Sequence, residues 1–327
     1  MVEPRVSVVV TTFNQGAYIG EAIRSVLAQT YTNREIIVVD DGSTDDSPKV
    51  LAGFGSAITT IRQQNEGIAG ARNRGIRAAG GRLLAFLDGD DRWYPDMLRK
   101  MVEAHERFPN SGLIACDGRS VDGDRIVRAR LLPSRVIAAS EAGEDPFISS
   151  ECLEHLIRGN LIATTTQTMI PRCVIDDVGL SDPAFRVASD YDLYLRIALK
   201  YRFTFVREQL VDWRYLPTSA SGPEALRHFV WTADDVAILR KHLRRVPSAL
   251  RPSISETLTR KARRIARKAY YRGRKTDRQW ARAYLWRLCL RCGGDPVVAI
   301  YLVAALTPAW IRSVVAPVVA RKLLQPE

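Results

Sequence analysis

Short apolar runs alternate with amphipathic stretches over residues 1–120. The runs Val6–Thr12, Glu35–Asp40 and Arg82–Leu87 have the continuous hydrophobicity of strands that are buried on both faces. Between these runs, apolar residues recur at helical spacing, most clearly in 17–29. The alternation predicts an α/β fold, with a mostly parallel sheet and helices on both of its faces.

The same patterns predict the remaining elements and one domain boundary. Helices are expected near 45–53, 68–79, 95–107, 151–158 and 189–200, and strands near 57–62, 112–116 and 166–171. Ser43 or Thr44 is the expected cap of the helix near 45–53, and 120–150 is expected to be irregular. The composition changes at Thr218–Pro223, after which basic helices are predicted over 224–244 and 253–290. We therefore predict a catalytic domain over 1–219 and a helical region over 220–327.

Charge separates the same two parts. Residues 220–327 carry 22 Lys and Arg against 7 Asp and Glu, whereas 1–219 carry 26 against 29. The overall charge of +12 therefore belongs to the C-terminal region. This region could lie on an anionic membrane surface, bind nucleic acid or form a solvated helix face.

Cysteines and histidines give no metal-site pattern. The five cysteines are scattered, and Cys289 and Cys292 have CxxC spacing without a second pair. We expect buried free thiols in a reducing compartment. The four histidines form no constellation and are expected to be structural. The N-terminal segment lacks the features of a signal peptide, which predicts a cytoplasmic location for the catalytic part.

Two acidic clusters follow predicted strands. Asp40 and Asp41 end the second strand, and Asp88, Asp90 and Asp91 end the fourth. In an open parallel sheet, ligands bind at the carboxyl ends of the strands. Carboxylates two residues apart can present oxygen ligands to Mg²⁺ or Mn²⁺, whose coordination is usually completed by substrate phosphates. A solvated acidic turn or a helix cap is the alternative interpretation, and it is weaker for the second cluster.

Five ordered segments resemble family 2 glycosyltransferases. They are SVVVTTFNQGAYIGEAIRSVLAQTY, IIVVDDGSTDDS, QNEGIAGARNRGI, LLAFLDGDDRWYPDML and ASDYDLYLRIA. A single Asp-x-Asp motif would be weak evidence, whereas the ordered series over roughly 5–215 is specific. The resemblance implies a GT-A fold, in which a Rossmann-like sheet binds a nucleotide-sugar, and an inverting transfer.

The resemblance also implies roles for individual residues. Thr11 would line the nucleotide pocket, and Asp41, supported by Asp40, would accept a hydrogen bond from the base, which we expect to be uracil. The residues expected near the nucleotide, its ribose or its diphosphate are Asn65, Arg72, Asn73 and Asp88. Asp90 would ligate the metal ion, and Asp88 would contact the ion or its bound water.

The segment Ser189–Asp192 resembles the part of the family that supplies the catalytic base. Asp190 would deprotonate the acceptor hydroxyl, and Asp192 is the fallback candidate. The chain departs from the family pattern in two places. Ser189 stands where the family usually has Glu, and Trp213–Pro217 lacks the His that often follows an Arg at the end of the domain. A histidine metal ligand is therefore not supported there.

The sequence thus predicts an inverting transferase that uses a nucleotide diphosphate-sugar, with a UDP-sugar as the expected donor. A glycan or lipid-linked acceptor is expected, in polysaccharide, glycolipid or cell-surface glycan synthesis. The uncharged segment Val297–Ile311 and the apolar stretch up to Ala320 favour docking on the inner face of the membrane over spanning it, and packing against the catalytic domain or a partner chain is the alternative. The alternatives are a metal-dependent nucleotidyl or phosphoryl transferase and a nucleic-acid-binding module, although no nucleic-acid partner is expected.

Overall fold

The computed structural model describes most of the chain, namely residues 3–134, 136, 145–185, 187–216 and 230–273. Contacts divide the chain into two compact units, 1–225 and 226–327. The second unit contains α10 (Val230–His242) and α11 (Arg251–Gly273). The expectations for 217–229 and for 274–327, including the CxxC pair and the apolar segment 297–320, lie outside the described residues. No described helix combines the length and the apolarity that a membrane span requires.

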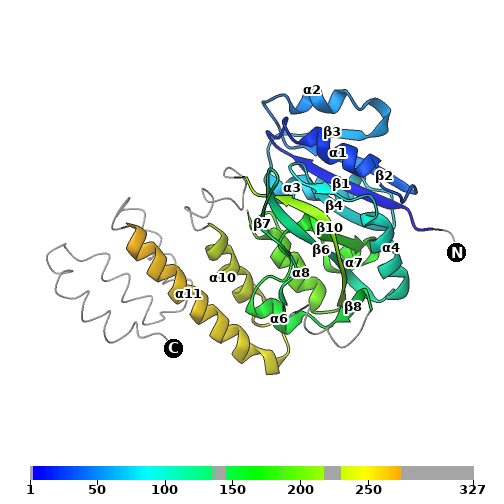
Figure 1. Cartoon of the computed structure of the whole chain (residues 1–327). Coiled ribbons are helices and arrows are strands. Elements are labelled where there is room, and N and C mark those ends of the chain that lie inside the picture. The colour runs from blue at the N-terminus through cyan, green and yellow to red at the C-terminus, as the bar shows by residue number, and fades with distance from the viewer. Residues whose placement is uncertain (1–2, 135, 137–144, 186, 217–229, 274–327) are drawn as a thin grey trace. The chain divides into compact units, whose positions relative to one another are not determined.

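The first unit alternates strands and helices (Figure 1). Its strands are β1 (Val6–Thr12), β2 (Arg34–Asp40), β3 (Thr59–Arg62), β4 (Leu83–Asp88), β5 (Arg92–Trp93), β6 (Ser111–Asp122), β7 (Arg125–Arg128), β8 (Phe147–Ser150), β9 (Thr168–Pro171) and β10 (Arg202–Arg214). Its α-helices are α1 (Ile19–Leu27), α2 (Ser47–Ala52), α3 (Gly67–Ala78), α4 (Met97–Arg107), α6 (Leu153–Arg158), α7 (Arg172–Val178) and α8 (Ser189–Ala198).

The strands form one sheet in the order β3-β2-β1-β4-β9-β6-β10-β5, with β7 beside β6 and β8 beside β10. The first four strands in this order are parallel, as is the pair β6–β10. β9 lies antiparallel between β4 and β6, and β5 is antiparallel to β10. The sheet is therefore mixed, whereas the sequence predicted a mostly parallel one.

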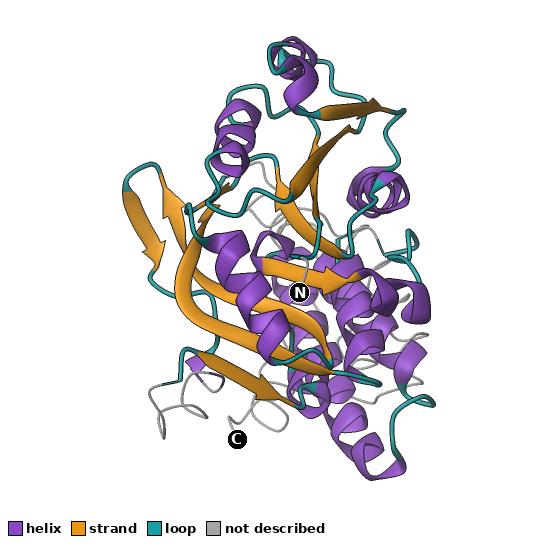
Figure 2. Ribbon diagram, turned by 90° about the vertical axis from the view of Figure 1, so that its right-hand side faces the viewer, coloured by secondary structure: helices purple, strands orange, loops and turns teal. Residues whose placement is uncertain are grey.

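Helices cover both faces of the sheet, as predicted (Figure 2). Val8 and Val10 of β1 pack on one face with apolar residues of α1 and α4. Val9 points to the opposite face, where it meets α3 at Gly75. The alternation of side chains along a strand explains why consecutive valines are buried on different faces. The chain order places the carboxyl ends of β1, β2 and β4 next to one another, because β1 pairs with both of the others.

Two local predictions were wrong. The cap expected at Ser43 or Thr44 is not formed, because α2 begins only at Ser47, after Asp46. The second error is larger, because no strand was predicted for the residues of β10. Its apolar alternation breaks at an irregularity between Val206 and Gln209, where the register against β6 shifts. Such an irregularity disrupts the two-residue period that sequence patterns detect.

Close packing at Gly75 fixes the position of α3. A Cβ atom added at Gly75 would lie 2.3 Å from Val9 Cγ1, whereas one added at Gly80 would meet no atom closer than 3.5 Å. We expect Gly75→Ala to lower the free energy of unfolding by about 1–3 kcal/mol, because valine has little rotamer freedom with which to relieve the overlap. Gly80→Ala is the matched control and should be nearly neutral. Urea unfolding of both variants checks this, and equal stabilities would contradict tight packing at Gly75.

Candidate active site

Four of the predicted nucleotide-binding residues, Thr11, Asp40, Asp41 and Asp88, lie at the carboxyl ends of three parallel strands. Thr11 is paired in register with Asp88, and Thr12 with Asp40. The Thr11 hydroxyl donates a hydrogen bond to Asp88 Oδ1 over 3.4 Å. The strand order reverses at β1, which is where open α/β sheets bind ligands. Burial of these side chains among apolar strands therefore points to a site rather than to a solvated turn.

Asp40 and Asp41 shape the turn after β2. Asp40 is 1% exposed, and its Oδ1 accepts the main-chain N–H of Ser43 over 2.9 Å. Asp41 faces the start of α3, where its Oδ1 accepts from Gln63 Nε2 and the Glu66 N–H, and its Oδ2 from the Gly67 N–H, all over 2.8–2.9 Å. The carboxylate of Asp41 thus fixes the loop that precedes α3.

Arg72 joins α3 to the end of β4. Its side chain is 9% exposed, and its Nη2 donates to Asp88 Oδ1 over 2.7 Å. Burial opposes the charge of this guanidinium, but the carboxylates of Asp88 and Asp190 raise the pKa of Arg72. Arg72 therefore lies within electrostatic reach of both the candidate metal cluster and the candidate base.

The other side of Asp88 contacts a run of threonines. The hydroxyls of Thr164 and Thr165 lie 3.5 and 3.3 Å from Asp88 Oδ2, and the Thr166 hydroxyl lies 3.2 Å from the Asp88 main-chain N. They belong to the short 3-10 turn before β9, Thr165–Gln167, and its cap. We did not select these residues from the sequence, although three consecutive threonines at the start of a predicted strand were a visible signal.

Asp90 and Asp91 are buried carboxylates in the loop after β4. Burial, reinforced by the charge of Asp88, raises the pKa of Asp90 to about 6. Burial and the charges of Asp90 and Asp88 raise the pKa of Asp91 well above its usual range. Asp91 accepts hydrogen bonds from the Thr166 hydroxyl and from the Arg214 main-chain N–H, over 2.5 and 2.8 Å. Burial and the proximity of the three carboxyl groups therefore oppose the ionisation of Asp90 and Asp91.

This donor set fits a hard divalent cation. Oxygen ligands and uncompensated negative charge are what Mg²⁺ or Mn²⁺ prefers. Within the part of the chain that the structure describes, no group of three or more His, Cys, Asp or Glu side chains is placed to hold a metal ion. A cation at Asp88 and Asp90 would therefore need further ligands from water or substrate, as is usual for Mg²⁺.

Asp190 lies in the first turn of α8. It lines a pocket with Arg72, Thr165 and Tyr194, on the face of the sheet that α3 covers. Asp192 is fully buried and accepts a hydrogen bond from Arg196 Nε over 3.0 Å. The two aspartates therefore have different surroundings, and it is Asp190 that faces the predicted site.

The structure separates two other predicted residues from this pocket. Asn73 is 4% exposed, and its amide group both donates to and accepts from the main chain of Ser181, over 2.8 and 3.0 Å. Asn65 is exposed in the loop that Asp41 holds. The interaction of Asn73 with Ser181 fixes the segment that leads towards α8.

Comparisons with known proteins point to one family. Residues 7–156 match the model of glycosyl transferase family 2. A protein of Rickettsia prowazekii described as an uncharacterized glycosyltransferase is 29% identical over 212 residues, which cover 64% of each chain. The alignment thus spans less than two thirds of that relative's length.

Solved structures share the fold. Staphylococcus aureus TarS in complex with UDP superposes with a TM-score of 0.63 at 16% identity, covering 97% of this chain and 87% of TarS. The same protein has also been solved in complex with UDP-GlcNAc. The mannosyltransferase PcManGT of Pyrobaculum calidifontis, in complex with GDP-Man and Mn²⁺, gives a TM-score of 0.54 at 20% identity over 99% of this chain and 81% of its own. These likenesses confirm the GT-A fold.

Proposed function

We propose that the protein, whose residues 7–156 match the model of glycosyl transferase family 2, is an inverting glycosyltransferase that moves a sugar from a nucleotide diphosphate-sugar to an acceptor hydroxyl. One observation carries the proposal. The buried guanidinium of Arg72 is ion-paired with Asp88 at the end of β4 over 2.7 Å, and the charge of Asp190 acts on the same guanidinium. In this arrangement, the carboxylates at the end of β4 would hold a cation that neutralises the leaving nucleoside diphosphate. Asp190 would act as the base for the attacking hydroxyl.

Each residue has a defined task in this mechanism. Asp190 accepts the proton of the acceptor hydroxyl as that oxygen attacks the anomeric carbon. A single displacement of this kind inverts the anomeric configuration. Asp90, with Asp88, would hold Mg²⁺ or Mn²⁺, which supplies charge neutralisation for the departing nucleoside diphosphate. Arg72 keeps Asp88 in place through their ion pair.

The donor is proposed to be a UDP-sugar. Asp41 Oδ2 accepts a hydrogen bond from the Gly67 N–H and, as a carboxylate oxygen, can accept a second one from the imide N–H of a base. Thr11 lies beside Asp88 on the neighbouring strand, where ribose and diphosphate would approach. The complexes of TarS with UDP and with UDP-GlcNAc support this choice of nucleotide. A nucleotidyl or phosphoryl transferase is less favoured, because it leaves Asp190 without a task.

The acceptor is proposed to be a glycan or a lipid-linked saccharide in the synthesis of a polysaccharide, a glycolipid or a surface glycan. The basic region 220–327 would attract the anionic inner face of a membrane, at about 1 kcal/mol for each Lys or Arg close to the surface. We propose that residues 1–219 form the catalytic domain. We further propose that the protein is cytoplasmic and attaches peripherally to the membrane through residues 220–327.

Donor hydrolysis tests the activity without knowledge of the acceptor. We expect the full chain to release UDP from one member of a panel of UDP-sugars when Mn²⁺ or Mg²⁺ is present, and to lose this activity with EDTA. GDP-sugars serve as the comparison for nucleotide choice. The measurement is nucleoside diphosphate release, combined with calorimetry of UDP binding in the presence of Mn²⁺. A chain that neither turns over any nucleotide-sugar nor binds a nucleoside diphosphate would refute the proposal.

A further inference from the structure

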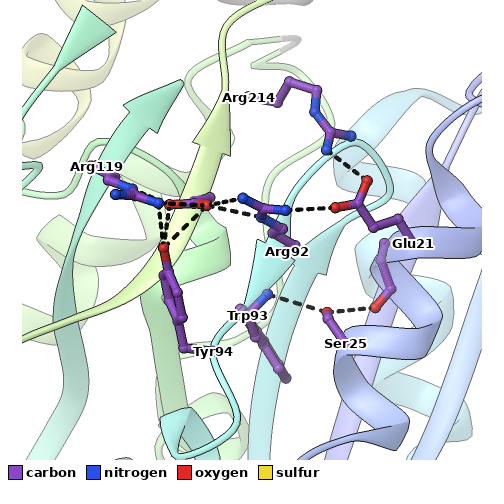
Figure 3. Close-up of polar contacts among 9 residues, drawn as sticks. Glu21, Ser25, Arg92, Trp93, Tyr94, Arg119 and Arg214 are labelled. Carbon is purple, nitrogen blue, oxygen red and sulfur yellow. Dashed lines mark hydrogen bonds and ion pairs between the residues drawn. The ribbon is translucent and has the colours of Figure 1, made fainter. Parts of the chain in front are cut away.

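A second polar cluster lies in the half of the sheet formed by β6, β10 and β5 (Figure 3), next to Asp91, which accepts the main-chain N–H of Arg214. We call it the arginine cluster. Its members are Glu21, Arg92, Tyr94, Arg119, Asp212 and Arg214. None of them was selected from the sequence, and the proposed mechanism uses none of them.

Asp212 is the centre of the arginine cluster. Its side chain is 1% exposed and accepts from Arg92 Nη2 and Arg119 Nε, each over 2.7 Å. The register explains the contact, because β10 pairs Asp212 with Arg119 of β6 on one side and with Arg92 of β5 on the other. Burial opposes the charge of Asp212, but the two arginines lower its pKa. One ionised, buried carboxylate thus fixes two guanidinium groups side by side.

The two guanidinium groups remain accessible. The side chain of Arg92 is 42% exposed and that of Arg119 is 31% exposed. Arg119 donates through Nε to Asp212 and through Nη2 to Tyr94 Oη, over 2.6 Å in the latter case. No hydrogen bond from its Nη1 is found within the described residues, and a guanidinium has five N–H donors. The fork of Arg119 is therefore oriented by the protein and still has donors for a ligand.

Arg214 adds a third cation next to the candidate metal loop. Its Nη2 donates to Glu21 over 2.9 Å, and its guanidinium lies 4.7 Å from the centre of the Tyr18 ring. Its Nη1 is buried and has no partner among the described residues. A buried unpaired donor is uncommon, because its desolvation is not repaid. The charge of Arg214 also acts on Asp90 in the candidate metal loop, whereas Arg92 and Arg119 share the single buried carboxylate of Asp212.

We propose that the arginine cluster binds an anionic group of the acceptor, so that the acceptor is an acidic glycan carrying carboxylate or phosphate groups. The inference rests on the proposed function, since it assigns the substrate class of the same site. Planar guanidinium forks match carboxylate and phosphate oxygens in pairs, and their prior fixation lowers the entropic cost of binding. The location favours the acceptor over the donor. The predicted nucleotide residues follow β1, β2 and β4, whereas Arg92 and Arg119 belong to β5 and β6.

Calorimetry on the full chain tests the proposal with defined probes. The probes are an oligogalacturonate, which carries carboxylates, inorganic polyphosphate, and a neutral maltooligosaccharide of equal length. We expect the acidic probes to bind and the neutral one not to bind. Arg119→Gln should weaken the binding of at least one acidic probe about tenfold, which corresponds to the loss of one charge-assisted hydrogen-bonded contact. The probe that is more affected identifies the anionic group.

A matched variant separates this contact from general charge attraction, to which the basic C-terminal region also contributes. Arg77→Gln removes an exposed arginine from α3 and the same charge, and it should leave the affinity for acidic probes unchanged. Equal weakening by both variants, or unchanged affinity in Arg119→Gln, would overturn the proposal. UDP binding with Mn²⁺ reports on folding and on the proposed function independently. If Arg119→Gln does not fold, Arg119→Lys keeps the charge but not the fork, and an unchanged affinity of that variant would likewise overturn it.

Discussion

Replacing Asp190 with asparagine is expected to lower the rate of sugar transfer about a thousandfold, the usual range for loss of a general base. Asparagine keeps the shape of the side chain but cannot accept the proton of the acceptor hydroxyl. Binding of UDP should survive, because Arg72 retains its ion pair with Asp88 over 2.7 Å. The assay is UDP release from the donor that the wild-type chain uses, together with calorimetry of UDP and Mn²⁺.

Two other aspartates make this experiment specific. Asp177→Asn changes a carboxylate that pairs with Lys200 near the surface, and it should leave the rate unchanged. Asp192→Asn should instead destabilise the fold, because it breaks a buried ion pair with Arg196. Full activity in Asp190→Asn would remove the assigned base. Selective loss of activity in a well-folded Asp192→Asn would transfer that assignment to Asp192.

Part of the fold could be predicted because its signals are local. β2 and β4 contain continuous apolar runs, and the helices α1 and α3 show helical spacing, so the strand ends that carry Asp40 and Asp88 were located. The mixed half of the sheet could not be read in this way. The direction of β9 between β4 and β6 depends on pairing between strands that are far apart in the sequence, and local patterns do not report it. The interruption near Glu208 hid β10, and with it Asp212.

The residues of the site likewise fall into those that the sequence predicted and those that it did not. Residues adjacent to strand ends, such as Asp88 and Asp90, were selected because a strand end has a recognisable sequence. The contact between Asn73 and Ser181 joins residues far apart in the chain, and spacing carries no trace of it. The arginine cluster was missed for the same reason. Its buried carboxylate and its guanidinium groups come from separate strands, and only the register of the sheet brings them together.

Asp90→Asn is expected to abolish cation-assisted UDP binding and, without cation, to stabilise the fold at pH 8. Burial and the charge of Asp88 raise the pKa of Asp90 from 3.8 to about 6. A carboxyl group whose pKa is raised by folding destabilises the folded state when it is ionised. This cost is absent below pH 4, grows between pH 4 and about 6, and is complete above that. The shift in pKa corresponds to a destabilisation of about 2–3 kcal/mol when Asp90 is ionised. The asparagine variant carries no charge at this position and therefore avoids this destabilisation.

Asp88→Asn provides a comparison of opposite sign from the same loop. Asp88 pairs with the guanidinium of Arg72, so its neutralisation leaves a buried cation without its partner and should lower stability at pH 8. Urea unfolding of both variants in EDTA, at pH 4 and pH 8, measures the two effects. If Asp90→Asn changes stability equally at the two pH values, the buried charge of Asp90 is not what destabilises the loop. A stabilised variant that no longer binds Mn²⁺ and UDP would instead show that this destabilising charge serves cation binding.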